Sequence, residues 1–185
     1  MPPKSKRAAL IVIDVINRFD FPEAPGLLRQ ARRAGPRIAA LARRFRAVRW
    51  PVIYANDNHG KWRSNFAQVV QACSHEGAPG AWLARLLAPE RQDYFVLKPE
   101  QSAFFGTPME DLLRDLRLRE VVLTGIAGDG CVLATAVDAN MRGFGVRVPS
   151  DCCASPTKLR NDRVLAVLRD SLQIPTARGA SVPVG

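Results

Sequence analysis

The sequence predicts an α/β protein whose parallel β-sheet is covered by helices on both faces. Short apolar runs alternate with segments of helical periodicity, and the first run, residues 8–14, is apolar until it ends at Asp14. Alternating strands and helices are typical of parallel sheets with right-handed crossovers. A run that is apolar at odd and even positions alike suits a central strand buried on both faces.

The same pattern gives the expected elements in order. Strands are expected at residues 8–14, 51–55, 94–97, 120–124 and 145–149, with a short edge strand at 172–175. Helices are expected from about residue 36 to 48 and at 82–87, 111–118, 133–143 and 155–168. The first helix is expected to begin near Pro36, because a proline at the first helical position gives up no hydrogen bond.

Length and composition indicate one domain over residues 1–185, with loose tails at about 1–7 and 176–185. No apolar run is long enough to span a bilayer. The first residues are basic, and the strand-like run that follows them has no signal-peptide cleavage site. We therefore expect a tail before a strand rather than a signal peptide. The four cysteines form neither a disulfide framework nor a zinc motif, so we expect a reducing, cytoplasmic location and no membrane partner.

Positive charge is concentrated at the start of the chain. Twelve of the 27 Lys and Arg residues lie in the first fifty positions against three Asp and Glu, which places nine of the ten net charges there. Nucleic-acid binding is one interpretation. The other is the solvated face of an amphipathic helix, because apolar residues recur every three or four positions from Leu27 to Val48. Without a recognition motif we favour the second.

Three polar residues follow three of the expected strands: Asp14, Lys98 and, after a loop reading GIAGDG, Cys131. Ligands of parallel α/β sheets bind at the carboxyl ends of the strands. Cys131 begins a helix, whose dipole favours a thiolate. Asp14 could act as general base, Lys98 could stabilise negative charge, and backbone N–H groups of the loop could stabilise an oxyanion. The alternatives are an ordinary salt bridge and an inert buried thiol.

Three sequence blocks resemble the isochorismatase-like cysteine hydrolases, which include nicotinamidases and N-carbamoylsarcosine amidase. They are LIVIDVINRFDF around Asp14, LKPEQSAFFGT around Lys98 and LTGIAGDGCVLATAVDA around Cys131, followed by VPSDCCAS. The resemblance implies a three-layer, Rossmann-like fold with a six-stranded parallel sheet in the order 3-2-1-4-5-6. It also implies catalytic Asp14, Lys98 and Cys131, a cis peptide between Ile126 and Ala127, an oxyanion hole from the N–H groups of Ala127 and Cys131, and a homodimer or homotetramer.

The chain departs from its relatives at several positions. Isochorismatases proper carry glycine in place of Cys131, so cleavage of isochorismate is not expected. Many relatives have threonine in place of Gly128 and a bulkier residue in place of Gly130.

Nicotinamidases add a metal site built on an Asp-x-His pair and two further histidines. Asp57 and His59 have the first spacing, but the chain's only other histidine is His75, and Asn65 stands where another would be expected. Cys73 or His75 could supply a third ligand. We expect no metal and no cofactor, with Asp57 and His59 on the rim of the pocket.

Loop and strand-end residues are candidates for binding a small-molecule substrate. They are Asn17, Phe19, Tyr54, Trp62, Arg63, Phe104 and Gly128. Core packing is the alternative for the aromatic residues, above all Tyr54 and Phe104, and Asn17 could instead cap the loop after Asp14. Arg63 could bind a substrate carboxylate or face solvent.

Together these features predict a cysteine hydrolase that cleaves a C–N bond of a small amide or carbamoyl compound through a thioester on Cys131. Two alternatives remain open. One is a metal-assisted nicotinamidase. The other is a catalytically silent binding or scaffold protein with a basic N-terminal surface. We do not favour nucleic acid as the partner of that surface.

Overall fold

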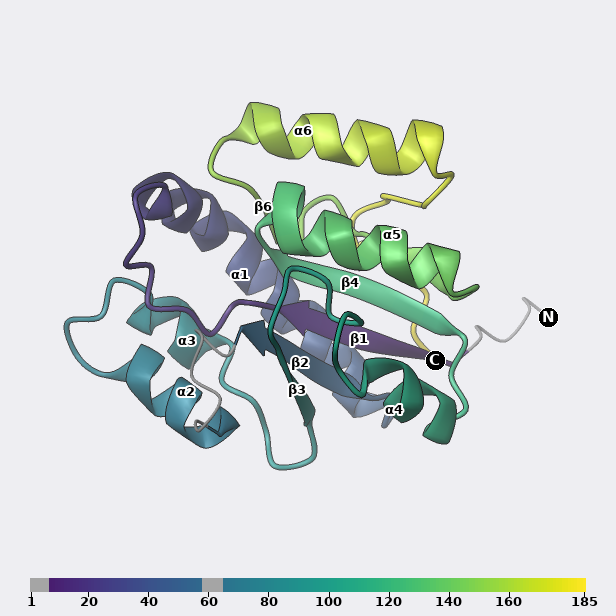
Figure 1. Ribbon diagram of the computed structural model, residues 1–185, viewed down its shortest axis with the longest axis horizontal. Helices are drawn as coiled ribbons and strands as arrows, with labels where there is room; N and C mark the ends of the chain where they lie inside the picture. The colour runs from purple at the N-terminus through teal and green to yellow at the C-terminus, as the bar shows by residue number, and fades with distance from the viewer. Residues whose placement is uncertain (1–6, 58–64) are drawn as a thin grey trace.

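The sheet is parallel throughout in the computed structural model, which describes residues 7–57 and 65–185 (Figure 1). Its strands are β1 (Ala8–Ile13), β2 (Val52–Asp57), β3 (Tyr94–Lys98), β4 (Glu120–Ile126), β5 (Gly145–Arg147) and β6 (Cys153–Ala154). The order β3-β2-β1-β4-β5 confirms the expected sheet. The short β6 pairs with the far end of β4, beyond the point where β5 leaves it.

Helices cover both faces of the sheet (Figure 1). They are α1 (Ala24–Ala47), α2 (Phe66–Ser74), α3 (Ala81–Leu86), α4 (Met109–Asp115), α5 (Leu133–Met141) and α6 (Lys158–Ala166). Side chains of β1 alternate between two cores: Leu10 and Val12 pack with α1 to α3, whereas Ala9 and Ile11 pack with α4 to α6. This is the pattern expected of a central strand, whose successive side chains point to opposite faces.

The predicted start of the first helix is wrong. Helix α1 begins at Ala24, with Pro25 in its first turn, and Pro36 lies in its interior. A proline inside a helix removes one hydrogen bond. The apolar stripe that begins at Leu27 and reaches Phe45 is buried against the sheet, and this burial offsets that loss. The arginines of α1 lie mostly on the exposed side, as the solvated-face interpretation predicts.

The C-terminal segment is packed rather than loose, which corrects the predicted tail at 176–185. The Arg44 guanidinium donates to the carbonyl oxygens of Gly179 and Val182, at 2.8 Å and 2.6 Å. The Val182 side chain joins the core on the α1 side. Such contacts join residues more than a hundred positions apart and leave no trace in local periodicity.

The edge strand predicted at residues 172–175 does not form. The segment instead runs beside the end of β5, where the N–H of Val148 donates to the carbonyl of Pro175 at 3.0 Å. Among the described residues, no helix combines the length and the apolar character that crossing a membrane requires.

Gly125, near the end of β4, allows β1 and β4 to approach closely. Its φ is +120°, and a Cβ there would lie 2.1 Å from the carbonyl oxygen of Ile13. Gly125→Ala should therefore lower the free energy of unfolding by about 3 kcal/mol, measured by denaturant titration. The matched control is Gly143→Ala, whose φ is also positive but whose Cβ would meet nothing within 4 Å. That change should cost only about 1 kcal/mol, and equal losses would contradict the close-approach explanation.

Candidate active site

The carboxyl ends of three strands, β1, β3 and β4, bring Asp14, Lys98 and Cys131 together. Asp14 directly follows β1, Lys98 is the last residue of β3, and Cys131 lies just beyond β4. Because β3, β2, β1 and β4 are parallel, their carboxyl ends share one edge of the sheet. The convergence predicted from the strand ends is what the structure shows.

The lysine ammonium group lies between the other two side chains. Lys98 Nζ is 2.8 Å from Asp14 Oδ2 and 3.6 Å from Cys131 Sγ, and it donates to the carbonyl of Glu100 at 3.0 Å. The Cys131 thiol and the Asp14 carboxylate are close enough to shift each other's pKa. Lys98 is 1% exposed and Asp14 is 5% exposed, so this is a buried ion pair with a thiol in contact.

The Asp14 carboxylate is held from a third side by backbone. The N–H of Asp57, at the end of β2, donates to Asp14 Oδ1 at 2.8 Å. Asp14 itself has a φ of +51°, in the left-handed region that few non-glycine residues adopt. Strained backbone of this kind is frequent at functional sites, where the surrounding structure holds it in place.

Burial controls the protonation of the acid and the base. Burial raises the pKa of Asp14, against the opposing effects of Lys98, the Cys131 thiol and the Asp57 N–H. Burial alone would lower the pKa of Lys98, but the charges around it, chiefly Asp14, keep that pKa above its usual value. The ammonium therefore stays charged, while the carboxylate has a stronger affinity for a proton than an exposed aspartate has.

The surroundings of Cys131 oppose the thiolate that its position at the start of a helix favours. Burial, followed by the negative charge of Asp14, raises the pKa of Cys131 to about 12, and Lys98 lowers it only in part. The helix dipole on which the expectation rested does not outweigh these two effects. Of the groups that shift this pKa, the Asp14 carboxylate is the one that can accept a proton.

The loop that carries Cys131 has an unusual backbone. The peptide between Ile126 and Ala127 is cis. A π-helical segment, Gly128–Val132, then runs directly into α5, so Cys131 lies in the first turns of one continuous helix. Within the described chain, the N–H of Ala127 makes no hydrogen bond to another residue. It is therefore available as a donor.

Ser155, which directly follows β6, and Asn161 of α6 support this loop, and sequence reasoning did not find their role. Ser155 Oγ accepts from the N–H of Asp129 at 3.1 Å and donates to Asn161 Oδ1 at 3.0 Å. A Cβ at Gly128 would lie 2.4 Å from Asn161 Oδ1 and 2.8 Å from Ser155 Oγ. The space that a threonine would need at Gly128 is thus already filled. The contacts of Ser155 and Asn161 with the loop span 26 residues or more, so no local pattern could signal them.

The segment after β3 is tied to α5 by a second set of hydrogen bonds. Thr135 Oγ1 donates to the carbonyl of Cys131 at 2.7 Å and accepts from the N–H of Ala103 at 3.0 Å. Ser102 Oγ donates to Asp138 at 2.7 Å. These bonds hold the chain after Lys98 against the helix that follows Cys131.

Several predicted substrate contacts belong to the core instead. Tyr54 is 1% exposed, and its hydroxyl accepts from Arg46 at 3.4 Å. Phe104 is buried against Phe144, with ring centroids 5.6 Å apart. Phe19 is also buried. The core-packing alternative therefore holds for these aromatic rings.

The other predicted contacts have different outcomes. Asn17 caps the loop after Asp14, because its Oδ1 accepts from the N–H of Phe19 at 2.8 Å. Trp62 and Arg63 lie outside the described residues, so their predicted roles stay predictions.

Of the donors proposed for a metal, those that the structure describes form no group of three with Asp57. His59 lies outside the described residues. The Asn65 side chain caps α2 in a reciprocal hydrogen-bond pair with Gln68. Cys73 is buried in the core, and His75 is exposed at the end of α2. In the part of the chain that the structure describes, no three His, Cys, Asp or Glu side chains are grouped as a metal site requires.

Comparisons with known proteins agree with this geometry. The isochorismatase domain model matches residues 8–179. An uncharacterised isochorismatase family protein of Bacillus subtilis (YaaI) is 37% identical over 89% of this chain and 90% of its own. The maleamate amidohydrolase of Pseudomonas putida is 30% identical over 80% of this chain and 72% of its own.

A solved structure is similar along nearly the whole chain. It is an isochorismatase family protein from Desulfovibrio vulgaris, with a TM-score of 0.78 and 26% identity, covering 96% of this chain and 97% of its own. The matched domain includes all three clustered side chains and the cis peptide. The chain therefore belongs to the isochorismatase family and is a hydrolase of that family.

Proposed function

We propose that this protein hydrolyses the C–N bond of a small amide or carbamoyl compound, with Cys131 as nucleophile. One observation carries the proposal: a buried ammonium group contacts both a carboxylate and a thiol at the carboxyl edge of the sheet. A nucleophile beside a base, with that base oriented by further groups, is the arrangement that covalent hydrolysis needs. The similarity to maleamate amidohydrolase supports an amide as substrate.

The mechanism follows from the three side chains. Cys131 Sγ attacks the substrate carbonyl carbon as its proton passes to Asp14, and the N–H groups of Ala127 and Cys131 stabilise the oxyanion. Asp14 returns that proton to the leaving nitrogen, and the C–N bond breaks to give a thioester. Asp14 then takes a proton from water, the hydroxide oxygen attacks the thioester, and the proton restores the thiol. Lys98 stays charged and limits the cost of burying the carboxylate.

A screen of small amides tests the proposal. Purified protein is incubated with maleamate, nicotinamide, simple aliphatic amides and carbamoyl amino acids, and released ammonia is measured. We expect turnover of at least one of them, absent from a Cys131→Ala control. Ammonia release that persists in the control would contradict the proposal.

Asp14→Asn should separate thiol reactivity from catalysis. The carboxylate raises the pKa of Cys131 and Lys98 lowers it, so the amide variant should have a thiol pKa below that of the unchanged protein. At pH 9 iodoacetamide should then alkylate Cys131 faster in the variant, as followed by mass spectrometry. Amide hydrolysis should fall by about 10³-fold, because nothing carries the proton to the leaving nitrogen. Slower alkylation in the variant would contradict these assigned effects.

The pH profile should reflect the same groups. Asp14 must be ionised to accept the thiol proton, and its pKa is raised by burial, so kcat/KM should fall with decreasing pH above the range of an ordinary aspartate. Because the pKa of Cys131 is about 12, kcat/KM should not increase between pH 8 and 9, where an ordinary thiol loses its proton. We would measure kcat/KM from pH 4 to pH 10. A rise centred near pH 8.5 would indicate a preformed thiolate instead.

Further parts of the proposal concern metal, assembly and location. We propose that no metal takes part. The described residues support this, because the Asn65 side chain caps α2 and Cys73 is buried in the core. About one tightly held zinc, iron or manganese per chain, with activity lost on chelation, would support the metal-assisted alternative.

We also propose a homodimer or homotetramer, to be checked by light scattering. A cytoplasmic location is supported by four cysteines that all remain unpaired.

A further inference from the structure

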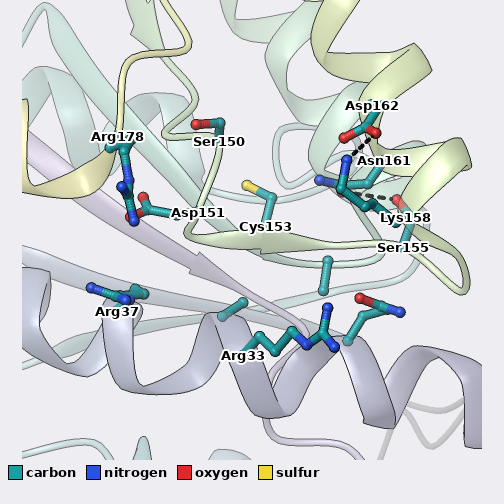
Figure 2. A pocket seen from close by; sticks show the side chains of 13 residues that line it. Arg33, Arg37, Ser150, Asp151, Cys153, Ser155, Lys158, Asn161, Asp162 and Arg178 are labelled. Atoms are coloured by element: carbon teal, nitrogen blue, oxygen red, sulfur yellow. Dashed lines mark hydrogen bonds and ion pairs between the residues drawn. The ribbon is translucent and has the colours of Figure 1, made fainter.

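A pocket of about 290 Å³ lies between α1 and the segment that contains β6 (Figure 2). One wall is formed by α1, the opposite wall by residues 150–155, and the remaining sides by the start of α6 and by Arg178. Neither Asp14, Lys98 nor Cys131 lines it. It is therefore separate from the candidate active site, although Ser155 and Asn161, which line it, also contact the loop before Cys131.

The lining of this pocket has an excess of positive charge. The pocket is lined by four cationic side chains and only two carboxylates. The cations are Arg33, Arg37, Lys158 and Arg178, and the carboxylates are Asp151 and Asp162. Both carboxylates already have partners. Asp162 pairs with Lys158, and Asp151 pairs with Arg178 at 3.3 Å while it also accepts from the N–H of Gly179 at 2.7 Å.

The two arginines of α1 carry the uncompensated charge. Over residues 7–57 and 65–185, neither Arg33 nor Arg37 makes an ion pair or a side-chain hydrogen bond. They are four residues apart on one helix, so both guanidinium groups extend from the same face, as Figure 2 shows. Each guanidinium offers a planar set of N–H donors that matches phosphate and carboxylate oxygens.

Neutral donors complete the lining. Asn161 uses its Oδ1 to accept from Ser155, which directs its amide NH₂ group elsewhere. In the part of the chain with described coordinates, this NH₂ group has no hydrogen-bond partner. The Ser150 hydroxyl lies on the opposite wall. A pocket that combines two unpaired guanidinium groups with neutral donors is suited to an anion rather than to a neutral or cationic molecule.

We propose that this pocket binds a small dianion, either a phosphate group or a dicarboxylate. Each guanidinium group can donate two hydrogen bonds to an oxyanion, and a bound dianion would balance the two positive charges. The volume suits a compact ligand, because pockets for drug-sized molecules start at about 300 Å³. The proposal does not depend on the hydrolase mechanism, since none of the reacting groups lines the pocket.

Isothermal titration calorimetry tests this proposal. The purified full chain is titrated with sodium phosphate and, separately, with sodium malonate, at constant ionic strength and with chloride as the reference anion. We expect saturable binding of about one anion per chain for at least one of the two probes. Binding of phosphate alone assigns the phosphate class, and binding of malonate alone assigns the dicarboxylate class. Binding of neither overturns the proposal.

Matched arginine variants show whether the pocket is the site. Arg33→Ala/Arg37→Ala should weaken binding at least about tenfold, because both bidentate partners are lost. Arg29→Ala/Arg43→Ala removes the same charge from exposed positions of the same helix that do not line the pocket, and should change affinity less than about twofold. Equal weakening in both variants would mean general attraction to a basic surface and would overturn the proposal. All four positions are exposed, and thermal unfolding checks that both variants fold.

Discussion

Cys131→Ser should reduce amide hydrolysis by about 10⁴-fold or more, the largest effect expected of any single change in this protein. The serine hydroxyl is a far weaker acid than a thiol, and the Asp14 carboxylate is too weak a base to remove its proton as readily. The substitution removes one polarisable atom from a site where Lys98 and Asp14 still pair, so the fold should persist. The measurement is kcat/KM on the best amide from the substrate screen.

The matched control for this change is another cysteine. Cys73 is buried in the core on the α1 side, and burial raises its pKa to about 11. Cys73→Ala should keep hydrolytic activity within about twofold, with at most a modest loss of stability from the small cavity. Retention of more than a tenth of the activity by Cys131→Ser would rule out the thioester mechanism.

Lys98→Met should lower the free energy of unfolding by about 3–5 kcal/mol near neutral pH. The ammonium group is 1% exposed and lies 2.8 Å from Asp14 Oδ2, so its removal leaves a buried carboxylate without its counter-charge. The measurement is urea denaturation. Lys158→Met is the matched control, because that lysine pairs with Asp162 at the surface and its loss should cost less than about 1 kcal/mol.

The pH dependence and a double variant identify the cause of that loss. Without Lys98, the buried Asp14 has a pKa in the folded state above its pKa in the unfolded state. The loss of unfolding free energy in Lys98→Met therefore grows as the pH rises from the lower to the higher of these two pKa values, and it shrinks in acid. Asp14→Asn/Lys98→Met should be more stable than Lys98→Met alone, because no buried charge remains and the side-chain amide oxygen introduced at this position can still accept from the N–H of Asp57. Activity should stay lost in both. A double variant that is less stable than Lys98→Met would show that packing, rather than charge, sets the cost.

The fold and the meeting of the three polar residues could be predicted from the sequence because both depend on features that are local in the chain. A run such as residues 8–14 is apolar on both faces, which suits it to a central parallel strand. Once strands alternate with helices, chain direction alone brings the residues after each strand to one edge. Asp14, Lys98 and Cys131 then need no further information to be recognised as neighbours.

The errors arose where a distant partner decides the outcome. Helix α1 continues past Pro36 because its stripe is buried against the sheet, and the C-terminal segment is ordered by Arg44 of that same helix. Tyr54 and Phe104 are aromatic residues near strand ends, but helix packing places their rings in the core. Such outcomes depend on contacts across the sheet, which no window of sequence contains.

The sequence by itself determined the architecture and the three reactive groups, since apolar periodicity and chain direction suffice for both. Only the tertiary structure decided the state of those groups, because burial depends on everything packed around them. It makes Cys131 a thiol with a pKa of about 12, and it fills the space at Gly128 with Ser155 and Asn161. It also leaves Arg33 and Arg37 without ion pairs over a pocket, within the residues that it describes. The charge of a residue can be read from its type, but its electrostatic surroundings exist only in the folded chain.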